Sequence, residues 1–333
     1  MKAILAKHGS MAKDSDAFTL IEQDKPKAEG KDILVKVEAI GMNPVDYKVR
    51  ELWETDVVLG WDAYGTVEAL GKDAKGFAEG DKVFYAGDIT RPGTNSEYHL
   101  VDHRIVAKAP EKVTPEQSAA MPLTAVTAWE ALFDRMGFVA EKDANRGRSI
   151  LIVGGAGGVG SVAIQIARWA GLKVYATASR PETSDWCKKL GADVIINHRN
   201  NLAEEIKQSG VDFVDSILCT TGAEAHWQAM ADAIAPQGRL VIIDDPDNNL
   251  DIRLFKLKSA AIMWEFMYTR SMFQTEDIEE QGKLLSEIAR LMDEGEITST
   301  LQETLDGLTV ENIRQMHIKQ ASGTMMGKQV LRV

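Results

Sequence analysis

A cluster of glycines directly after a β-rich run is the feature that most constrains the fold of this chain. Gly155, Gly157 and Gly160 have the spacing G-x-G-x-x-G, after the run SILIV and at the start of the helical stretch VGSVAIQIARWAG. In such a motif the first glycine allows a tight turn, the second lets the backbone approach a pyrophosphate, and the third lets the helix pack on the strand. The N-terminus of the helix supplies amide hydrogens and partial positive charge for the anion. The motif therefore predicts a dinucleotide site that includes Gly155, Gly157, Gly158, Val159 and Gly160.

The same glycines argue against a membrane-spanning helix. An uncharged stretch of 19 residues, SILIVGGAGGVGSVAIQIA, lies between Arg148 and Arg168, and its length alone would suggest such a helix. Five glycines interrupt it, and each costs about 1 kcal/mol relative to alanine inside a helix. We therefore expect strand, turn and helix in this stretch, and no membrane partner.

The pattern of expected secondary structure changes at about Leu123. Before it, runs such as KDILVKVEAIGMNP, DAYGTVEALG and EYHLVDHRIV alternate and end at turn residues, which predicts a β-rich region. After it, β-rich runs alternate with helical stretches, which predicts parallel strands joined by crossover helices. We expect IRLFKLKSAAIMWEFMYTR to be the last of these strands, with an aromatic tail. Two helices should follow, in EDIEEQGKLLSEIARLMDEG and LTVENIRQMHIKQASG, and then a closing strand in KQVLRV.

Length and composition limit the possible functions. A chain of 333 residues suggests two domains. The formal net charge of −12 would repel a phosphate backbone, so we expect no nucleic-acid partner. Cys187 and Cys219 lack a C-x-x-C spacing, which indicates neither a disulfide framework nor a cysteine-built zinc site and favours a cytoplasmic location. The N-terminal segment MKAILAKHGS is interrupted by Lys7 before a signal-peptide core could form.

The end of the second strand of the α/β region indicates which dinucleotide binds. NAD enzymes place an acidic residue there to bind the ribose 2′-hydroxyl, whereas NADP enzymes place an arginine near the 2′-phosphate. This chain has Ser179 and Arg180 there, and no acidic residue from Ser161 to Pro181, which favours NADP. The alternative is that Arg180 is a solvated loop charge and Glu182 binds the ribose. Two further cofactor candidates follow later strands, where ligands bind in open α/β sheets: Thr220 and Asp244.

Five segments, in order and with family spacing, carry a resemblance to a known family: GMNPVDYKVR (41–50), LGWDAYGTVEALG (59–71), MPLTAVTAWEAL (121–132), IVGGAGGVGS (152–161) and WEFMYTRSMFQT (264–275). The chain resembles the medium-chain dehydrogenase/reductase superfamily, and within it the zinc-free quinone oxidoreductase branch, in a subgroup often labelled zinc-type alcohol dehydrogenase-like. The resemblance implies a GroES-like β-rich catalytic domain (1–122), an inserted Rossmann domain with a doubly wound parallel sheet (123–262), and a return segment that completes the catalytic domain (263–333).

The sequence differs from the zinc alcohol dehydrogenases at the positions of their metal ligands. Where those enzymes carry a cysteine ligand this chain has Asn43, where they carry His-Glu it has Trp61-Asp62, and the four-cysteine structural loop is missing. His99 and His103 have the spacing of metal ligands on a helix, but YHLVDHRIV alternates like a strand, which would hold the two rings about 13 Å apart. We therefore predict no metal.

The expected absence of zinc limits the chemistry. Without a Lewis acid to polarise a carbonyl, the hydride acceptor must already be electrophilic, as quinones and α,β-unsaturated carbonyls are. We expect a homodimeric NADPH-dependent oxidoreductase that acts on one of these small molecules. The alternatives are an alcohol or aldehyde dehydrogenase of the zinc type and a non-catalytic NADPH-binding sensor.

Several residues are candidates for roles that the resemblance implies. Asn43 could bind substrate or the nicotinamide ribose, or could be only a turn residue before a proline; Tyr47 could donate a proton or lie in the core. Thr127 matches a position near the nicotinamide, and His198 stands where relatives often have a tyrosine against the adenosine ribose phosphate. The predicted catalytic residues are Asn43, Asp46 and Tyr47, and the predicted substrate pocket contains Trp61, Phe266 and Tyr268. Trp264, Phe266 and Tyr268 form an aromatic cluster that could line the substrate site, lie in a subunit interface or pack in the core.

Overall fold

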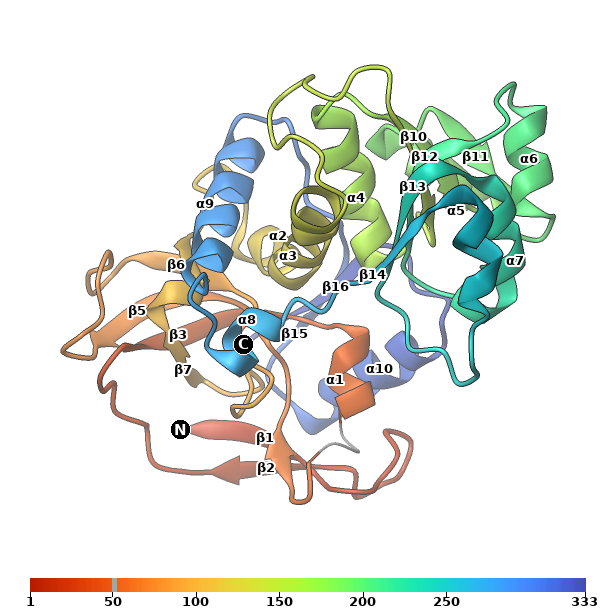
Figure 1. Cartoon of the computed structure of the whole chain (residues 1–333). Coiled ribbons are helices and arrows are strands. Elements are labelled where there is room, and N and C mark those ends of the chain that lie inside the picture. Colours follow the sequence, from red (N-terminus) through yellow and green to blue (C-terminus); the bar gives the residue numbers. More distant parts are fainter. Residues whose placement is uncertain (50–52) are drawn as a thin grey trace. The chain divides into compact units, whose positions relative to one another are not determined.

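The structure is a computed structural model that describes residues 1–49 and 53–333 (Figure 1). The chain divides into two compact units. Unit 1 consists of Met1–Val126 and Met267–Val333, and unit 2 of Thr127–Phe266. One continuous segment therefore forms unit 2, inserted into the chain of unit 1, as the predicted fold class requires. The boundaries predicted after residues 122 and 262 lie a few residues before those of the two units.

Unit 1 is built on a seven-stranded sheet in the order β15-β16-β3-β5-β6-β8, with β7 paired to β3, and on a three-stranded sheet in the order β2-β1-β4. Its elements are β1 (Lys2–Ala6), β2 (Phe18–Glu22), β3 (Asp32–Gly41), α1 (Pro44–Lys48), β4 (Val57–Val58), β5 (Asp62–Leu70), β6 (Lys82–Tyr85), β7 (Tyr98–Asp102), η2 (His103–Ile105), β8 (Val106–Lys108), α2 (Pro115–Ala119), α8 (Thr269–Phe273), α9 (Glu279–Asp293), β15 (Leu301–Asp306), α10 (Val310–Ala321) and β16 (Lys328–Arg332). The closing strand β16 pairs antiparallel with β3, so that Val330 lies opposite Gly41. This pairing brings the C-terminal strand beside the segment that leads to Asn43.

Unit 2 is an α/β unit whose six strands are all parallel. Helix α3 (Pro122–Trp129) carries the chain into it and continues as a π-helix, η3 (Glu130–Arg135). The remaining elements are β9 (Ser149–Val153), α4 (Gly158–Trp169), β10 (Lys173–Thr177), α5 (Pro181–Leu190), β11 (Val194–Ile196), α6 (Leu202–Gln208), β12 (Val214–Cys219), α7 (Ala223–Ala233), β13 (Ile234–Ile242), η4 (Ile252–Lys258) and β14 (Ala261–Trp264). The strand order β11-β10-β9-β12-β13-β14 is that of a doubly wound Rossmann sheet. In such a sheet ligands bind outside the carboxyl ends of the strands, where the order reverses, here between β9 and β12.

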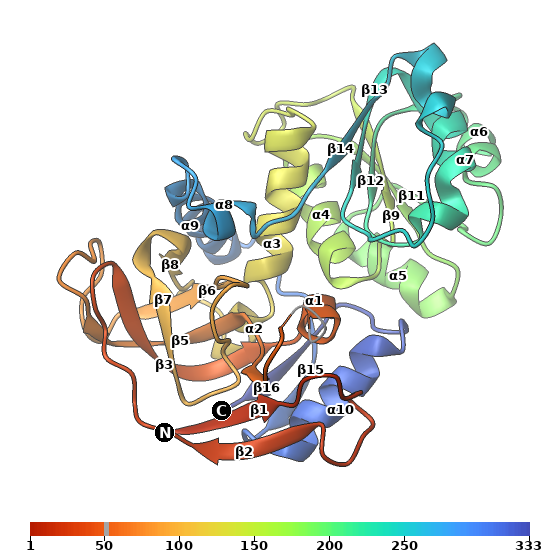
Figure 2. The same ribbon diagram turned by 60° about the horizontal axis from the view of Figure 1, so that its bottom comes forward.

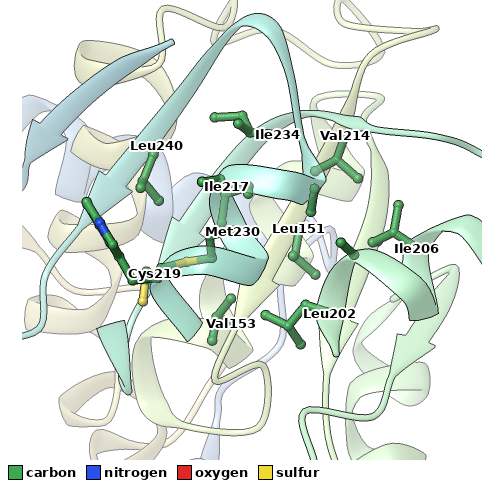
Figure 3. Close-up of a cluster of buried hydrophobic side chains, with 14 of the residues drawn as sticks. Leu151, Val153, Leu202, Ile206, Val214, Ile217, Cys219, Met230, Ile234 and Leu240 are labelled. Atoms are coloured by element: carbon green, nitrogen blue, oxygen red, sulfur yellow. The ribbon is translucent and has the colours of Figure 1, made fainter. Parts of the chain in front are cut away.

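Alternating side chains cover both faces of this sheet. Leu151 and Val153 on β9 belong to a buried cluster with side chains of α6 and α7 (Figure 3). Ile150 and Ile152 are also fully buried, and because side chains alternate along a strand they lie on the opposite face, which α4 covers (Figure 2). The continuous apolar run SILIV is therefore a central strand buried on both faces.

The predicted last strand of the α/β region is only partly a strand. Its middle part forms β14, which pairs in parallel with β13. Its first part forms the 3-10 helix η4 instead. Asp251 caps this helix by accepting a hydrogen bond from the backbone N–H of Arg253 at 3.0 Å, and Phe255 is its buried residue. Local capping therefore determines the conformation of this segment, as it does where aspartate precedes a helix.

The run EYHLVDHRIV is a strand only as far as Asp102. The Asp102 carboxylate accepts a hydrogen bond from the backbone N–H of Arg104 at 3.0 Å, and the chain turns into the 3-10 helix η2. The prediction that His103 continues the strand was therefore wrong, whereas His99 does lie on β7. No helix in residues 1–49 and 53–333 is long and apolar enough to cross a membrane.

Candidate functional site

The glycine motif of unit 2 forms the turn from β9 into α4, with Gly157 at the N-cap. A Cβ at Gly160 would lie 2.2 Å from the carbonyl oxygen of Gly154, and a Cβ at Gly155 would lie 2.9 Å from the Ala176 Cβ, so both positions require glycine for packing. A Cβ at Gly157 would meet only the Gly154 oxygen, at 3.4 Å, which is an ordinary contact. The protein itself therefore does not require a glycine at 157, whereas a phosphate approaching the helix N-terminus would. These residues fit a dinucleotide pyrophosphate.

Polar residues at the carboxyl ends of neighbouring strands hold this turn. Thr177, the last residue of β10, accepts a hydrogen bond from the backbone N–H of Gly154 through Oγ1 at 2.9 Å. Thr220 follows β12 and donates its hydroxyl to the carbonyl of Val153 at 2.8 Å. Asp244 follows β13 and accepts from the backbone N–H of Ala223, at the start of α7, at 3.2 Å. Thr220 and Asp244 thus lie where cofactor residues were predicted, and each also stabilises the local backbone.

Ser179 and Arg180 follow β10, and Arg180 is the N-cap residue of α5. The Nε of Arg180 forms an ion pair with Glu182 at 2.9 Å. The two residues that sequence analysis treated as alternative ribose ligands are therefore paired with each other. His198 follows the neighbouring strand β11, with its ring centroid 6.4 Å from that of His226 on α7.

In unit 1 the segment 41–46 forms a buried polar network with β5 and β16. Asn43 is fully buried and donates through Nδ2 to Oδ2 of Asp62 at 2.7 Å. The ammonium of Lys328 donates to the same Asp62 oxygen at 3.0 Å, to the Met42 carbonyl at 2.6 Å and to Oδ1 of Asn43. The other oxygen of Asp62 accepts from the backbone N–H of Leu123 at 2.6 Å. One buried cation thus neutralises a buried carboxylate, and the asparagine joins them.

Asp46 adds a second carboxyl group to this region. Its Oδ2 accepts from the backbone N–H of Asn43 at 2.7 Å, and its Oδ1 has no hydrogen-bond partner among the residues of the described chain. Burial raises the pKa of Asp46 to about 7, although the Asn43 N–H and the Lys328 charge act in the opposite direction. Burial also raises the pKa of Asp62, against the opposing effect of Lys328. Asp46 can therefore hold or release a proton near neutral pH.

The predicted aromatic and helical residues occupy different environments. Trp61 is fully buried, donates its indole N–H to the Asp88 carbonyl at 2.9 Å and packs edge-on against Tyr268 with 6.2 Å between ring centroids. Burial raises the pKa of Tyr268, and the neighbouring acids raise it further. Tyr47 lies half-buried on α1, Thr127 is buried on α3, and Phe266 is 47% exposed. The contacts of Trp61 favour core packing over the predicted contact with substrate.

The donor set at the former zinc positions does not fit a catalytic zinc ion. Such a site typically has three protein ligands of the cysteine, histidine or carboxylate type. Here the positions hold an amide, an indole and a carboxylate already paired with Lys328. His99 contacts the Tyr85 hydroxyl and the Pro92 carbonyl through its two ring nitrogens. Within the described ranges no group of three histidine, cysteine or acidic side chains is placed to hold a metal.

Three residues of these sites were not predicted from the sequence: Asp62, Lys328 and His226. Asp62 was noted only as part of a departure from the zinc enzymes, and its neighbour Trp61 was chosen instead. Lys328 had no local signal, because its partners are far away in the sequence and only the pairing of β16 with β3 brings them together. His226 lies on a helix whose sequence indicates only core packing, and only the fold places it beside His198.

Comparisons with known proteins agree with the fold. The family model for the alcohol dehydrogenase GroES-like domain matches residues 29–111, and that for the zinc-binding dehydrogenase matches residues 158–287. The chain is 41% identical to a zinc-type alcohol dehydrogenase-like protein of Staphylococcus aureus, over 96% of both chains. A crystal structure from Rhizobium etli, of a protein named after the zinc-dependent alcohol dehydrogenases, superposes with a TM-score of 0.95 at 47% identity over 100% of this chain and 98% of that one. The quinone oxidoreductase from Coxiella burnetii gives a TM-score of 0.83 at 25% identity over 100% and 99%.

A Rossmann unit inserted into a GroES-like unit, with a glycine turn from β9 into α4, defines a nicotinamide-dependent oxidoreductase. The chain belongs to the medium-chain dehydrogenase/reductase superfamily, among proteins of the zinc-type alcohol dehydrogenase-like kind. The predicted family and fold class are confirmed.

Proposed function

We propose that this chain transfers hydride from NADPH to a quinone or an α,β-unsaturated carbonyl compound without a catalytic metal. The observation that carries the proposal is a buried network in which Lys328 binds Asn43 and Asp62. Asn43 and Asp62 stand at sequence positions where the zinc alcohol dehydrogenases carry the cysteine and the His-Glu pair of their metal site. The Lys328 ammonium would repel a divalent cation at this place. Without a Lewis acid, the acceptor must itself be electrophilic, which favours quinones and enones over simple aldehydes.

Arg180 supports NADPH as the cofactor. It lies directly after β10, where an arginine can reach the 2′-phosphate of the adenosine ribose. Its ion pair with Glu182 is partly exposed, and such pairs contribute little, so a phosphate dianion can compete for the guanidinium. The glycine turn at 154–160 would hold the pyrophosphate against the N-terminus of α4.

The chain's own residues can supply the proton that completes the reaction. When bound, NADPH supplies a hydride, and the reduced acceptor then needs one proton. Asp46 can hold that proton on Oδ1, the buried oxygen that makes no hydrogen bond in the described chain, because its pKa is about 7. Asn43 has both ends of its amide bonded within the network, so we propose that it positions Asp46 and α1. Tyr47, half-buried on the same helix, is the second candidate for the proton.

A substrate panel tests this function. NADPH oxidation followed by absorbance should be rapid with at least one small quinone or enone, and it should survive treatment with a metal chelator. NADP-linked oxidation of alcohols that is lost with chelator and restored by zinc would favour the zinc-type alcohol dehydrogenase. Tight NADPH binding with no turnover of quinones, enones or aldehydes would favour a sensor.

An Arg180→Ala variant tests the cofactor. Loss of charge-assisted hydrogen bonds worth about 1.5–3 kcal/mol should weaken NADPH binding roughly 10- to 150-fold, with NADH affinity nearly unchanged. Arg253→Ala is the matched control, because Arg253 is also in unit 2 but is 84% exposed and paired with Asp251. Equal losses of NADPH and NADH affinity in Arg180→Ala would contradict the assignment.

The edge strand β14 supports the expected homodimer. It pairs only with β13 in the six-stranded sheet, and unpaired edges are templates for pairing with another chain. Trp264, at the end of β14, is 57% exposed. We propose that a second copy pairs along β14. Light scattering should then show a dimer, and Trp264→Glu should weaken it. Phe273→Glu, which changes an exposed aromatic residue on α8, should leave the dimer intact.

A cytoplasmic location stays a prediction.

A further inference from the structure

Two histidines of unit 2 face each other near the carboxyl ends of the Rossmann strands. His198 follows β11, and His226 lies in the first turn of α7, after β12. Their ring centroids are 6.4 Å apart with the planes at 67°. Both are half-buried, and neither imidazole hydrogen-bonds to another residue of ranges 1–49 and 53–333. Their ring nitrogens are therefore available to a ligand.

His198 and Arg180 follow two neighbouring strands of the Rossmann sheet. β10 and β11 are adjacent and parallel, with Thr177 opposite Ile196. Arg180 and His198 thus follow neighbouring strands by a few residues, and the positive charges of Arg180 and Arg199 both act on His198. A phosphate bound by Arg180 would lie beside this imidazole.

The charges that act on His198 are the positive ones of Arg199 and Arg180, and the acids near the pair have partners of their own. Glu182 pairs with Arg180, and Glu205 accepts from the backbone N–H of Asn197 and the side chain of Asn200. At the start of α7, Glu224 binds Asn248 and Asp244 binds the backbone of Ala223. In the part of the chain that the structure describes, neither histidine forms an ion pair with an acid.

The free protein therefore keeps both imidazoles neutral at pH 7. Burial lowers the pKa of His198, and Arg199 and Arg180 lower it further. Burial likewise lowers the pKa of His226, with the charge of His198 as the second cause. A proton on His198 thus opposes protonation of His226, so the pair takes up at most one proton near neutral pH.

Building on the proposed use of NADPH, we propose that the His198–His226 pair takes up one proton when the ribose 2′-phosphate binds beside Arg180, so that the preference for NADPH over NADH increases as the pH falls toward 6. A nearby anion stabilises the protonated imidazole and raises its pKa in the complex. Binding must then tighten as the pH falls from the pKa of the complex toward that of the free protein, by at most about tenfold per pH unit for one proton. Below about pH 6 the phosphate itself takes up a proton, and the trend levels off.

Equilibrium binding measures this linkage without turnover. We would titrate the protein with NADPH, NADH and 2′,5′-ADP between pH 6 and 8.5 by calorimetry, in two buffers of different ionisation enthalpy. The proposal requires net proton uptake with NADPH and 2′,5′-ADP that approaches one, and almost none with NADH. The Kd ratio of NADH to NADPH should rise several-fold from pH 8 to pH 6.5.

Variants assign the proton to the pair. His198→Gln should abolish most of the uptake, and His226→Gln should leave an uptake that approaches one proton on His198, because Arg199 and Arg180 are the charges that act on His198. His8→Gln, at an exposed histidine of unit 1, should change neither. Binding of NADH reports that each variant is folded.

Three results would overturn the inference, and they separate it from the proposed function. A strong NADPH preference that is independent of pH, with no proton uptake, leaves the cofactor assignment intact and removes the histidine linkage. Uptake that persists in the double variant His198→Gln/His226→Gln places the proton elsewhere. Equal affinities for NADPH and NADH at every pH remove the cofactor assignment and the linkage together.

Discussion

Replacing Lys328 by methionine should destabilise unit 1 by about 3–5 kcal/mol, because it leaves a buried carboxylate without its cation. The Lys328 side chain is 3% exposed and Asp62 is fully buried, with 3.0 Å between Nζ and Oδ2. Methionine keeps most of the volume, so the loss is mainly electrostatic. At a urea m-value of about 2 kcal/mol/M the unfolding midpoint should fall by roughly 1.5–2.5 M. Hydrogen exchange in peptides from β3 and β16 would report that the loss lies in unit 1.

Lys319→Met is the matched control for this change. Lys319 is also in unit 1 and forms an ion pair with Glu303, but the two side chains are 45% and 42% exposed, and such surface pairs contribute about 0–1 kcal/mol. Adding Asp62→Asn to Lys328→Met should recover part of the loss, since it removes the unpaired charge. If Lys328→Met and Lys319→Met shift the midpoint equally, the account of a buried ion pair is refuted.

Three further predictions follow from the same sites. Asp46 has a pKa raised to about 7 in the folded protein, so its ionisation opposes folding: stability should be fully present below about pH 4 and fall as the pH rises to about 7. Asp46→Asn should therefore raise the free energy of unfolding at pH 8, by at most about 4 kcal/mol for a pKa raised from 3.8 to about 7, and have no such effect at pH 4. An equal effect at both pH values would contradict the raised pKa. Gly160→Ala should destabilise unit 2 by about 2 kcal/mol or more, because its Cβ would overlap a backbone oxygen. Gly157→Ala should change the free energy of unfolding by less than about 1 kcal/mol but weaken binding of the pyrophosphate at least tenfold. A large change in stability would show that packing requires this glycine too.

The sequence predicts most of unit 2 and little of the network in unit 1. The glycine motif, the adjacent strand and the helix are contiguous, so their local pattern specifies both the fold and the phosphate site. The network of Asn43, Asp62 and Lys328 depends on strands that are far apart in the chain, and nothing in the sequence KQVLRV distinguishes a buried lysine from a solvated one. The misassigned segments, η4 and η2, each begin at an aspartate whose side chain caps a 3-10 turn, a local hydrogen bond that a pattern of apolar residues does not contain.

The net charge of −12 opposes the binding of an anionic cofactor, but the repulsion from distant charges has a short range. At physiological ionic strength charges separated by more than about 8 Å are largely screened, so distant acids have little effect on a bound phosphate. The segment from Gly154 to Arg180 contains no acidic residue and includes the N-terminus of α4. The formal charges of this segment are therefore positive, and Glu182, which follows it, is paired with Arg180. Cofactor binding then depends on where the charges lie in each unit and not on their sum.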